Sequence, residues 1–137
     1  MDGETSKKIL IVDDNKDSRD LTVKVLKRLG YQIIEAVDGE EALTRAFQDK
    51  PDLILMDRSL PKIDGLEVTR RLKTNAATQH IIILALTAHA MRGDKEKAIA
   101  AGCQGYIVKP IDVRKLPDEV KAHLEGERGS VHGGEKD

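Results

Sequence analysis

The chain contains five short segments rich in aliphatic residues, separated by longer polar stretches. They are Ile9–Val12, a weaker segment at Tyr31–Ala36, Leu53–Met56, Ile81–Leu86 and Tyr106–Val108. None of them alternates apolar with polar residues along its length. Continuous apolar runs are typical of strands covered on both faces, as in a parallel sheet. Because the stretches between them have helical patterns, the sequence predicts strands and helices in alternation.

Local signals place the first helices. Leu21, Val25 and Leu29 have helical spacing and precede Gly30, which predicts one buried stripe followed by a left-handed cap. Two further helices have the spacing of a capping box at their start, in which an N-cap residue and an acidic residue three positions later satisfy free amides. These pairs are Asp38 with Glu41, and Asp64 with Glu67.

The last two helical stretches are weaker. The stretch from about Met91 to Ala101 contains Gly93 and has a thin apolar face, so we expect it to be held weakly and able to move. In the final stretch Pro117 cannot donate a hydrogen bond inside a helix. We therefore expect a tight turn first and a regular helix that begins near Pro117.

Length and composition bound the domain organisation. A chain of 137 residues and 15.1 kDa fits one domain. We expect a flexible N-terminus at residues 1–6, a folded domain over 7–125 and a disordered tail over 126–137, which is rich in glycine and charge. No apolar run is long enough for a signal peptide or a membrane span. With the single cysteine Cys103, these features favour a cytoplasmic protein without membrane insertion.

Charge and aromatic content argue against nucleic-acid binding. The chain has 23 basic and 24 acidic residues, a formal net charge of −1, so bulk neutralisation of phosphates is not expected. Aromatic residues make up 2% of the chain, too few for the stacking surfaces that bind single strands. We therefore predict no direct contact with nucleic acid.

The residues that directly follow the apolar runs carry the candidate chemistry. Ligands of open parallel sheets bind outside the carboxyl ends of the strands. At the ends of the first, third, fourth and fifth runs the sequence has Asp13–Asp14, Asp57, Thr87 and Lys109–Pro110. Three carboxylates at one edge raise one another's pKa unless a cation lies among them, and oxygen ligands favour Mg²⁺. Since an aspartate can accept a phosphoryl group, the pattern indicates magnesium-dependent phosphoryl transfer.

The same residues identify a family resemblance. The chain from about Lys7 to Leu124 resembles the receiver domain of two-component response regulators, on a set of motifs that occur in the family's order. The set is Asp13–Asp14, Asp57 with Pro61 and Gly65, Thr87–Ala88, and Lys109–Pro110. The resemblance is greatest to receivers of hybrid histidine kinases and of single-domain cell-cycle or chemotaxis regulators. It implies an α/β, flavodoxin-like, doubly wound five-stranded parallel sheet in the order 2-1-3-4-5, with helices on both faces.

The resemblance also implies roles for individual residues. Asp57 would accept the phosphoryl group from a phosphohistidine, and Lys109 would pair with the phosphoryl oxygens. Mg²⁺ would be held by Asp13, Asp14, a carboxylate oxygen of Asp57 and the backbone carbonyl of Ser59. The bond between Lys109 and Pro110 is commonly cis in receivers.

A second group of residues would control or modulate the response. By the same resemblance Thr87 would turn toward the phosphoryl group, and Tyr106 would swing into the space that this vacates. The resemblance also implies that His89, two residues past Thr87, occupies a position that in receivers can influence how fast the phosphoryl group is lost. Arg58 is less usual than an apolar residue beside the acceptor, and its role stays open.

The leading interpretation is a monomeric, single-domain response regulator that catalyses only its own phosphorylation and dephosphorylation. Its expected partners are a sensor histidine kinase or a histidine phosphotransfer protein, and a downstream protein target. A phosphorelay intermediate and a terminal binding switch both fit. A phosphatase with an aspartyl-phosphate intermediate is the enzymatic alternative, but Ser59 stands where haloacid-dehalogenase-like enzymes have a second acid. A flavin carrier would need a phosphate-binding loop after the first strand, where Asp13–Asp14 would repel phosphate without a metal. A nucleotide switch would need a GxxxxGK[ST] loop, which this sequence lacks.

Overall fold

The structure, a computed structural model, describes residues 6–88 and 92–133. Its five parallel strands form one sheet, and their bounds are β1 (Lys8–Val12), β2 (Gln32–Ala36), β3 (Leu53–Asp57), β4 (Ile82–Thr87) and β5 (Gly105–Val108). The strand order is β2-β1-β3-β4-β5. The predicted sheet topology is therefore confirmed.

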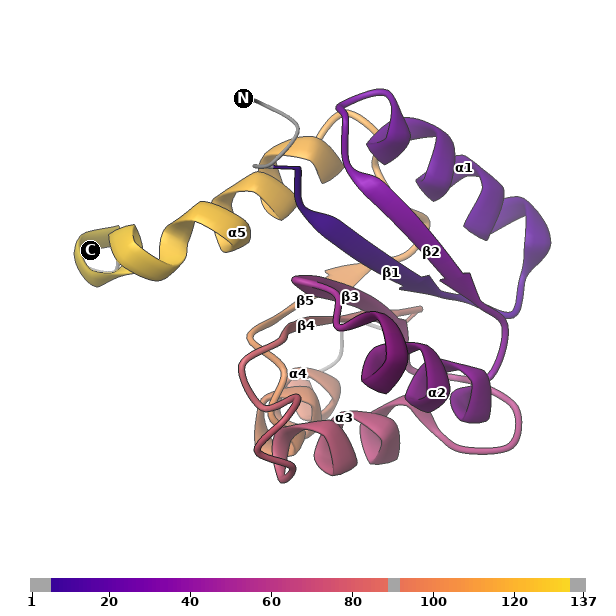
Figure 1. The fold of residues 1–137 in the computed structure, drawn as a ribbon. Helices are drawn as coiled ribbons and strands as arrows, with labels where there is room; N and C mark the ends of the chain where they lie inside the picture. The colour runs from indigo at the N-terminus through magenta and orange to yellow at the C-terminus, as the bar shows by residue number, and fades with distance from the viewer. Residues whose placement is uncertain (1–5, 89–91, 134–137) are drawn as a thin grey trace.

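Helices cover both faces of this sheet. In chain order they are α1 (Lys16–Lys27), α2 (Gly39–Asp49), α3 (Gly65–Lys73), α4 (Arg92–Ala101) and α5 (Leu116–Gly133). Figure 1 shows α2, α3 and α4 on one side of the sheet and α1 and α5 on the other. This is the predicted doubly wound α/β architecture.

Two hydrophobic clusters, one on each face, hold the layers together. One cluster joins alternate residues of the central strands to α2, α3 and α4, and the other joins the intervening strand residues to α1 and α5. All five residues of β3 and all six of β4 are buried. These strands read as continuous apolar runs because both of their faces are covered.

The predicted buried stripe of the first helix is wrong. Leu21 and Leu29 are 44% and 51% exposed, whereas the residues buried in α1 are Thr22 and Leu26. The Thr22 hydroxyl donates a hydrogen bond to the carbonyl of Ser18 (3.0 Å), so it can face the core at little cost. A pattern that counts threonine as polar therefore selects the wrong face of this helix.

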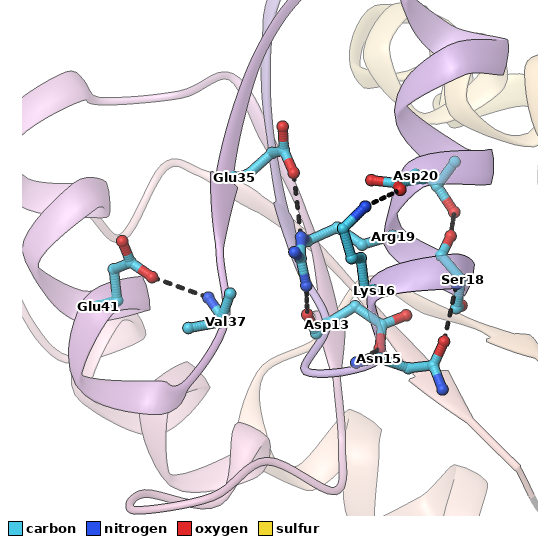
Figure 2. Close-up of polar contacts among 10 residues, drawn as sticks. Asp13, Asn15, Lys16, Ser18, Arg19, Asp20, Glu35, Val37 and Glu41 are labelled. Carbon is cyan, nitrogen blue, oxygen red and sulfur yellow. Dashed lines mark hydrogen bonds and ion pairs between the residues drawn. The ribbon is translucent and has the colours of Figure 1, made fainter.

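One of the two predicted helix starts has the expected hydrogen bonds. The side chain of Asp38 accepts a bond from the Glu41 amide (2.8 Å), and Glu41 in turn accepts one from the amide of Val37 (2.9 Å; Figure 2). At α3 the prediction is wrong, because the Asp64 side chain makes no capping bond. There, Glu67 instead pairs with two arginines of its own helix.

The last two helices follow the sequence in part. Over residues 93–101 of α4 the buried side chains are Ala98 and Ala101, in keeping with the thin apolar face. Helix α5 begins at Leu116 after a turn, with Pro117 in its first turn, as predicted. It continues over 126–133, where the sequence predicts a disordered tail. The domain boundaries themselves stay predictions.

Candidate functional site

Three carboxylates lie together at the carboxyl ends of β1 and β3. Asp13, Asp14 and Asp57 each offer one oxygen, and these oxygens lie within 4.8 Å of one another. Asp13 and Asp57 are buried, and Asp14 is exposed. The two strands are parallel neighbours, and the pairing of Val12 with Met56 brings the residues that follow to the same height. The three acidic residues that the sequence singled out are thus brought together.

Lys109, directly after β5, reaches across the sheet edge to two of these carboxylates. Its Nζ lies 3.2 Å from Oδ2 of Asp57 and 3.2 Å from Oδ2 of Asp13. The backbone amide of Lys109 donates to the carbonyl of Thr87 at the end of β4 (2.7 Å), and the Lys109–Pro110 peptide bond is cis. One ammonium group therefore bridges the ends of β1 and β3.

The start of α1 fixes Asp13. Oδ1 of Asp13 accepts a bond from the Asn15 amide (3.0 Å), while Asn15 caps the helix by accepting from the Ser18 amide (2.8 Å). Arg19 donates from Nη1 to the Asp13 carbonyl (2.8 Å) and from Nε to Glu35 (3.0 Å), as Figure 2 shows. Side-chain and backbone bonds together hold the carboxylate at the end of its strand.

Two glycines enclose the loop that follows Asp57. A Cβ on Gly65 would lie 2.1 Å from the carbonyl oxygen of Asp57, and the Gly65 amide donates to the Arg58 carbonyl (3.2 Å). On the other side, a Cβ on Gly39 would lie 2.2 Å from the carbonyl oxygen of Ile63. Both are approaches of backbone to backbone that only glycine permits. The glycine eight residues after Asp57 is therefore required by packing.

Burial and charge set the protonation of the site. Burial raises the pKa of Asp57, more than the Ser59 amide and Lys109 lower it. Burial also acts to raise the pKa of Asp13, but hydrogen bonds from Asn15 and Ser18 and the charge of Lys109 outweigh it and leave that pKa lowered. The pKa of Lys109 is raised because the charges of both aspartates outweigh the opposing effect of burial. Lys109 therefore stays protonated beside them.

The donor set fits a hard divalent cation. Asp13 Oδ2 is buried and accepts no well-directed hydrogen bond from the described residues, although it lies within ion-pair distance of Lys109. A buried carboxylate oxygen without such a bond has capacity for a metal ligand bond. All three side chains offer oxygen, the ligand that Mg²⁺ prefers. The Ser59 amide donates to Oδ1 of Asp57 (3.1 Å), which places Ser59 beside the site.

The two candidate switch residues lie on neighbouring strands. Thr87 is buried at the end of β4, one position beyond Leu86, which pairs with Asp57. Tyr106 in β5 pairs with Ala85 and is half-buried against the cluster under α2, α3 and α4. Both therefore lie between the carboxylates and α4.

Of the two candidate modulating residues, His89 lies outside the described residues. Arg58 is described, and its Nη1 lies 2.5 Å from Oδ1 of Asp94 in the first turn of α4. Sequence reasoning missed Asp94. The two residues are far apart in the chain, and no spacing rule connects them.

Comparisons with known proteins agree with this geometry. The family described as the response regulator receiver domain matches residues 9–121. The polar-differentiation response regulator DivK of Brucella anthropi is 42% identical over 118 residues, which are 86% of this chain and 96% of that protein. The chemotaxis response regulator CheY4 of Vibrio cholerae has a TM-score of 0.81 at 29% identity, over 85% of this chain and 97% of that chain.

A third similar protein has been solved with a metal. It is the receiver domain of a sensor histidine kinase from Pseudomonas aeruginosa, with a TM-score of 0.80 and 33% identity. The alignment covers 87% of this chain and 98% of that chain, and that structure has a magnesium ion coordinated in its active site cleft.

Proposed function

Because the chain belongs to the response regulator receiver domain family, we propose that Asp57 accepts a phosphoryl group from a phosphohistidine. Members of this family are signalling phosphoacceptors that interact with histidine kinases and downstream targets, and a phosphoacceptor aspartate with a magnesium site is typical of them. The observation that carries the assignment is the Lys109 ammonium, 3.2 Å from Asp57 Oδ2 beside two further carboxylates.

Asp13, Asp14, Asp57 and the backbone carbonyl of Ser59 would hold Mg²⁺. The bound ion would offset the negative charge of the acceptor and of the incoming phosphoryl oxygens. The support from this chain is the oxygen donor set and the buried Oδ2 of Asp13.

In the transfer step a carboxylate oxygen of Asp57 attacks phosphorus. An O–P bond forms, the N–P bond to the donor histidine breaks, and its electron pair stays on the imidazole nitrogen. Lys109 moves with the charge, from pairing with a carboxylate to pairing with a phosphoryl oxygen. The chain thereby catalyses only its own modification, and water reverses it by attack on the acyl phosphate.

The response to phosphorylation would pass through Thr87 and Tyr106. The Thr87 hydroxyl would bond to the phosphoryl group, and the Tyr106 ring would move toward the space that this leaves. Their support is position: both side chains lie on strands between the carboxylates and α4. A phosphoryl group biases such a pair of packings only by the difference in its contacts with the two.

The partners would be proteins. A sensor histidine kinase or a histidine phosphotransfer protein supplies the phosphoryl group, and a downstream protein reads the altered surface or receives the group in a relay. Reverse transfer to a phosphotransfer protein would distinguish the relay from the terminal switch. We place the protein in the cytoplasm as a monomer. No helix among residues 6–88 and 92–133 is both long and apolar enough to cross a membrane.

The direct test is magnesium-dependent labelling with a small acyl phosphate. Wild type becomes labelled and Asp57→Asn does not, because its amide cannot form an acyl phosphate. Asp52→Asn is the matched control, since Asp52 lies at the opposite end of β3, where Oδ2 accepts from the Lys8 amide (2.8 Å) and an amide oxygen can do the same. Full labelling of Asp57→Asn would contradict the acceptor assignment.

A further inference from the structure

Arg58 connects the acceptor loop to α4. Its Nη1 lies 2.5 Å from Oδ1 of Asp94, and the two side chains are 22% and 19% exposed. Charge-assisted bonds are the strong class of hydrogen bond, and partial burial lessens their screening by water. Arg58 directly follows Asp57 in the chain, so this bond begins one residue from the proposed acceptor.

The backbone of Arg58 is held on both sides. Its amide donates to the Leu86 carbonyl at the end of β4 (2.9 Å), and its carbonyl accepts from the Gly65 amide at the start of α3 (3.2 Å). The peptide is therefore attached to the two elements beside the site. The side chain alone extends from this fixed point to α4.

Helix α4 has few apolar contacts to fix its position. Ala98 and Ala101 are its buried side chains over residues 93–101, and a Cβ on Gly93 would meet nothing within 4 Å. Lys95 of the same helix makes a cation–π contact, with its Nζ 5.8 Å from the centroid of the Tyr106 ring. Two alanines bury little area, so polar contacts such as the one between Arg58 and Asp94 contribute a larger share of what positions this helix.

We propose that Arg58 is a positioning residue that makes α4 respond to the charge on Asp57, through its ion pair with Asp94. This rests on the proposed function of Asp57. The acyl phosphate carries a charge of about −1.5 to −2 where the carboxylate carried −1, so phosphorylation adds about −0.5 to −1 near Arg58, and this charge competes with Asp94 for the guanidinium. The competition weakens the ion pair and loosens the first turn of α4, a helix that buries two alanines over residues 93–101.

Hydrogen exchange of the α4 amides tests the proposal, with Mg²⁺ and beryllofluoride as the probe that mimics the phosphoryl group. In wild type the probe speeds exchange over residues 92–101. Arg58→Ala speeds it by about tenfold without any probe, in line with loss of a charge-assisted bond, and the probe then adds little. Arg58→Lys keeps the positive charge and restores part of the response to the probe, which a purely structural role would not do.

Arg70→Ala is the matched control. Arg70 also pairs with a carboxylate (2.8 Å to Glu67), but it lies on the exposed side of α3 and has no part in the link to α4. The Arg70→Ala variant should therefore keep the wild-type rate of α4 exchange and the wild-type response to the probe. If Arg58→Ala does not fold, Asp94→Asn removes the same ion pair with a side chain of the same size. Arg58 is the first choice because Asp94 has a further interaction.

The outcomes separate this proposal from the proposed function. Suppose the probe slows exchange at the ends of β1 and β3 in wild type, which shows that it binds. If it then changes α4 exchange equally in wild type and in Arg58→Ala, the role of Arg58 is overturned and the acceptor assignment stands. If the probe does not bind to wild type, the acceptor assignment fails. Exchange without the probe still decides whether Arg58 holds α4, because equal α4 rates in Arg58→Ala and Arg70→Ala contradict it.

Discussion

Strand β3, which carries the proposed acceptor, and helix α3 after it differ sharply in packing from α4 and β5, which we propose respond to it. All five residues of β3 are buried, and α3 buries five of its nine residues. In β5 only Ile107 is buried, and α4 contributes two buried alanines over residues 93–101. Figure 1 shows that α3 and α4 lie on the same side of the sheet, so the difference is one of side chains and not of layer.

This difference indicates a division of labour. Chemistry at Asp57 needs fixed geometry, which dense burial supplies. A signal needs an element with two packings of similar free energy, and sparse burial supplies that. The β3–α3 pair and the α4–β5 pair meet each requirement separately, and polar links such as Arg58 with Asp94 connect them.

The largest contrast is expected from deleting apolar volume in each helix. Leu72 in α3 is fully buried, so Leu72→Ala should lower the free energy of unfolding by about 3 to 4 kcal/mol through lost burial and a cavity. Ala98→Gly in α4 should cost only about 1 kcal/mol, mainly from helix propensity. Urea unfolding measures both, and equal losses would contradict the proposed difference in packing.

Adding a methyl group should change the free energy of unfolding in opposite directions in α3 and α4. Gly65→Ala should lower the free energy of unfolding by about 3 kcal/mol, because the new Cβ would lie 2.1 Å from the Asp57 carbonyl oxygen and one backbone must move. Gly93→Ala in α4 meets no atom within 4 Å and should raise it by about 0.5 to 1 kcal/mol. If urea unfolding shows that Gly93→Ala is destabilising, the surroundings of Gly93 in α4 are tightly packed and the proposed difference fails.

Adding Mg²⁺ should stabilise the region around Asp57, at the ends of β1 and β3. At a Mg²⁺ concentration a hundred times its dissociation constant, the free energy of unfolding should rise by about 2.7 kcal/mol. Asp13→Asn should gain much less, and chelation should remove the gain from wild type. Hydrogen exchange should slow at the ends of β1 and β3 and change little in α4. Equal slowing at the strand ends and in α4 would mean that the two regions unfold together.

The smallest expected effect lies beside β5. The ring of His123 in α5 packs close to Gly105, and burial lowers its pKa below the ordinary value of 6.5, against the opposing charge of Glu119. Because the unfolded chain then binds the proton more readily, stability should fall as pH decreases below about 6.5. His123→Gln should flatten this dependence in urea unfolding, whereas a variant of the exposed His80 should keep it.

Residues at the ends of strands could be predicted from the sequence. Asp13, Asp57, Thr87 and Lys109 follow buried apolar runs, and parallel strands bring such positions to one edge. Their convergence needs only the strand assignment and the strand order. Gly65 could be anticipated only from the family motif, and its cause, the close approach to the Asp57 carbonyl, is visible only in the structure.

Contacts that depend on the rotation of a helix or on distant partners could not be predicted. Leu21 and Leu29 form a plausible stripe, but the core accepts Thr22 because its hydroxyl bonds within the helix. Arg58 and Asp94 come from elements with no shared periodicity, so only the tertiary arrangement brings them together. Local pattern sets which faces are possible, and packing chooses among them.

The paired glycines around the loop after β3 have a consequence for engineering this protein. Gly39 meets the backbone at Ile63 from one side, and Gly65 meets it at Asp57 from the other. The backbone at the two ends of this segment, at Asp57 and at Ile63, therefore cannot shift toward either glycine without a clash. Libraries aimed at new donor proteins should therefore vary the exposed side chains between these two points and keep both glycines unchanged.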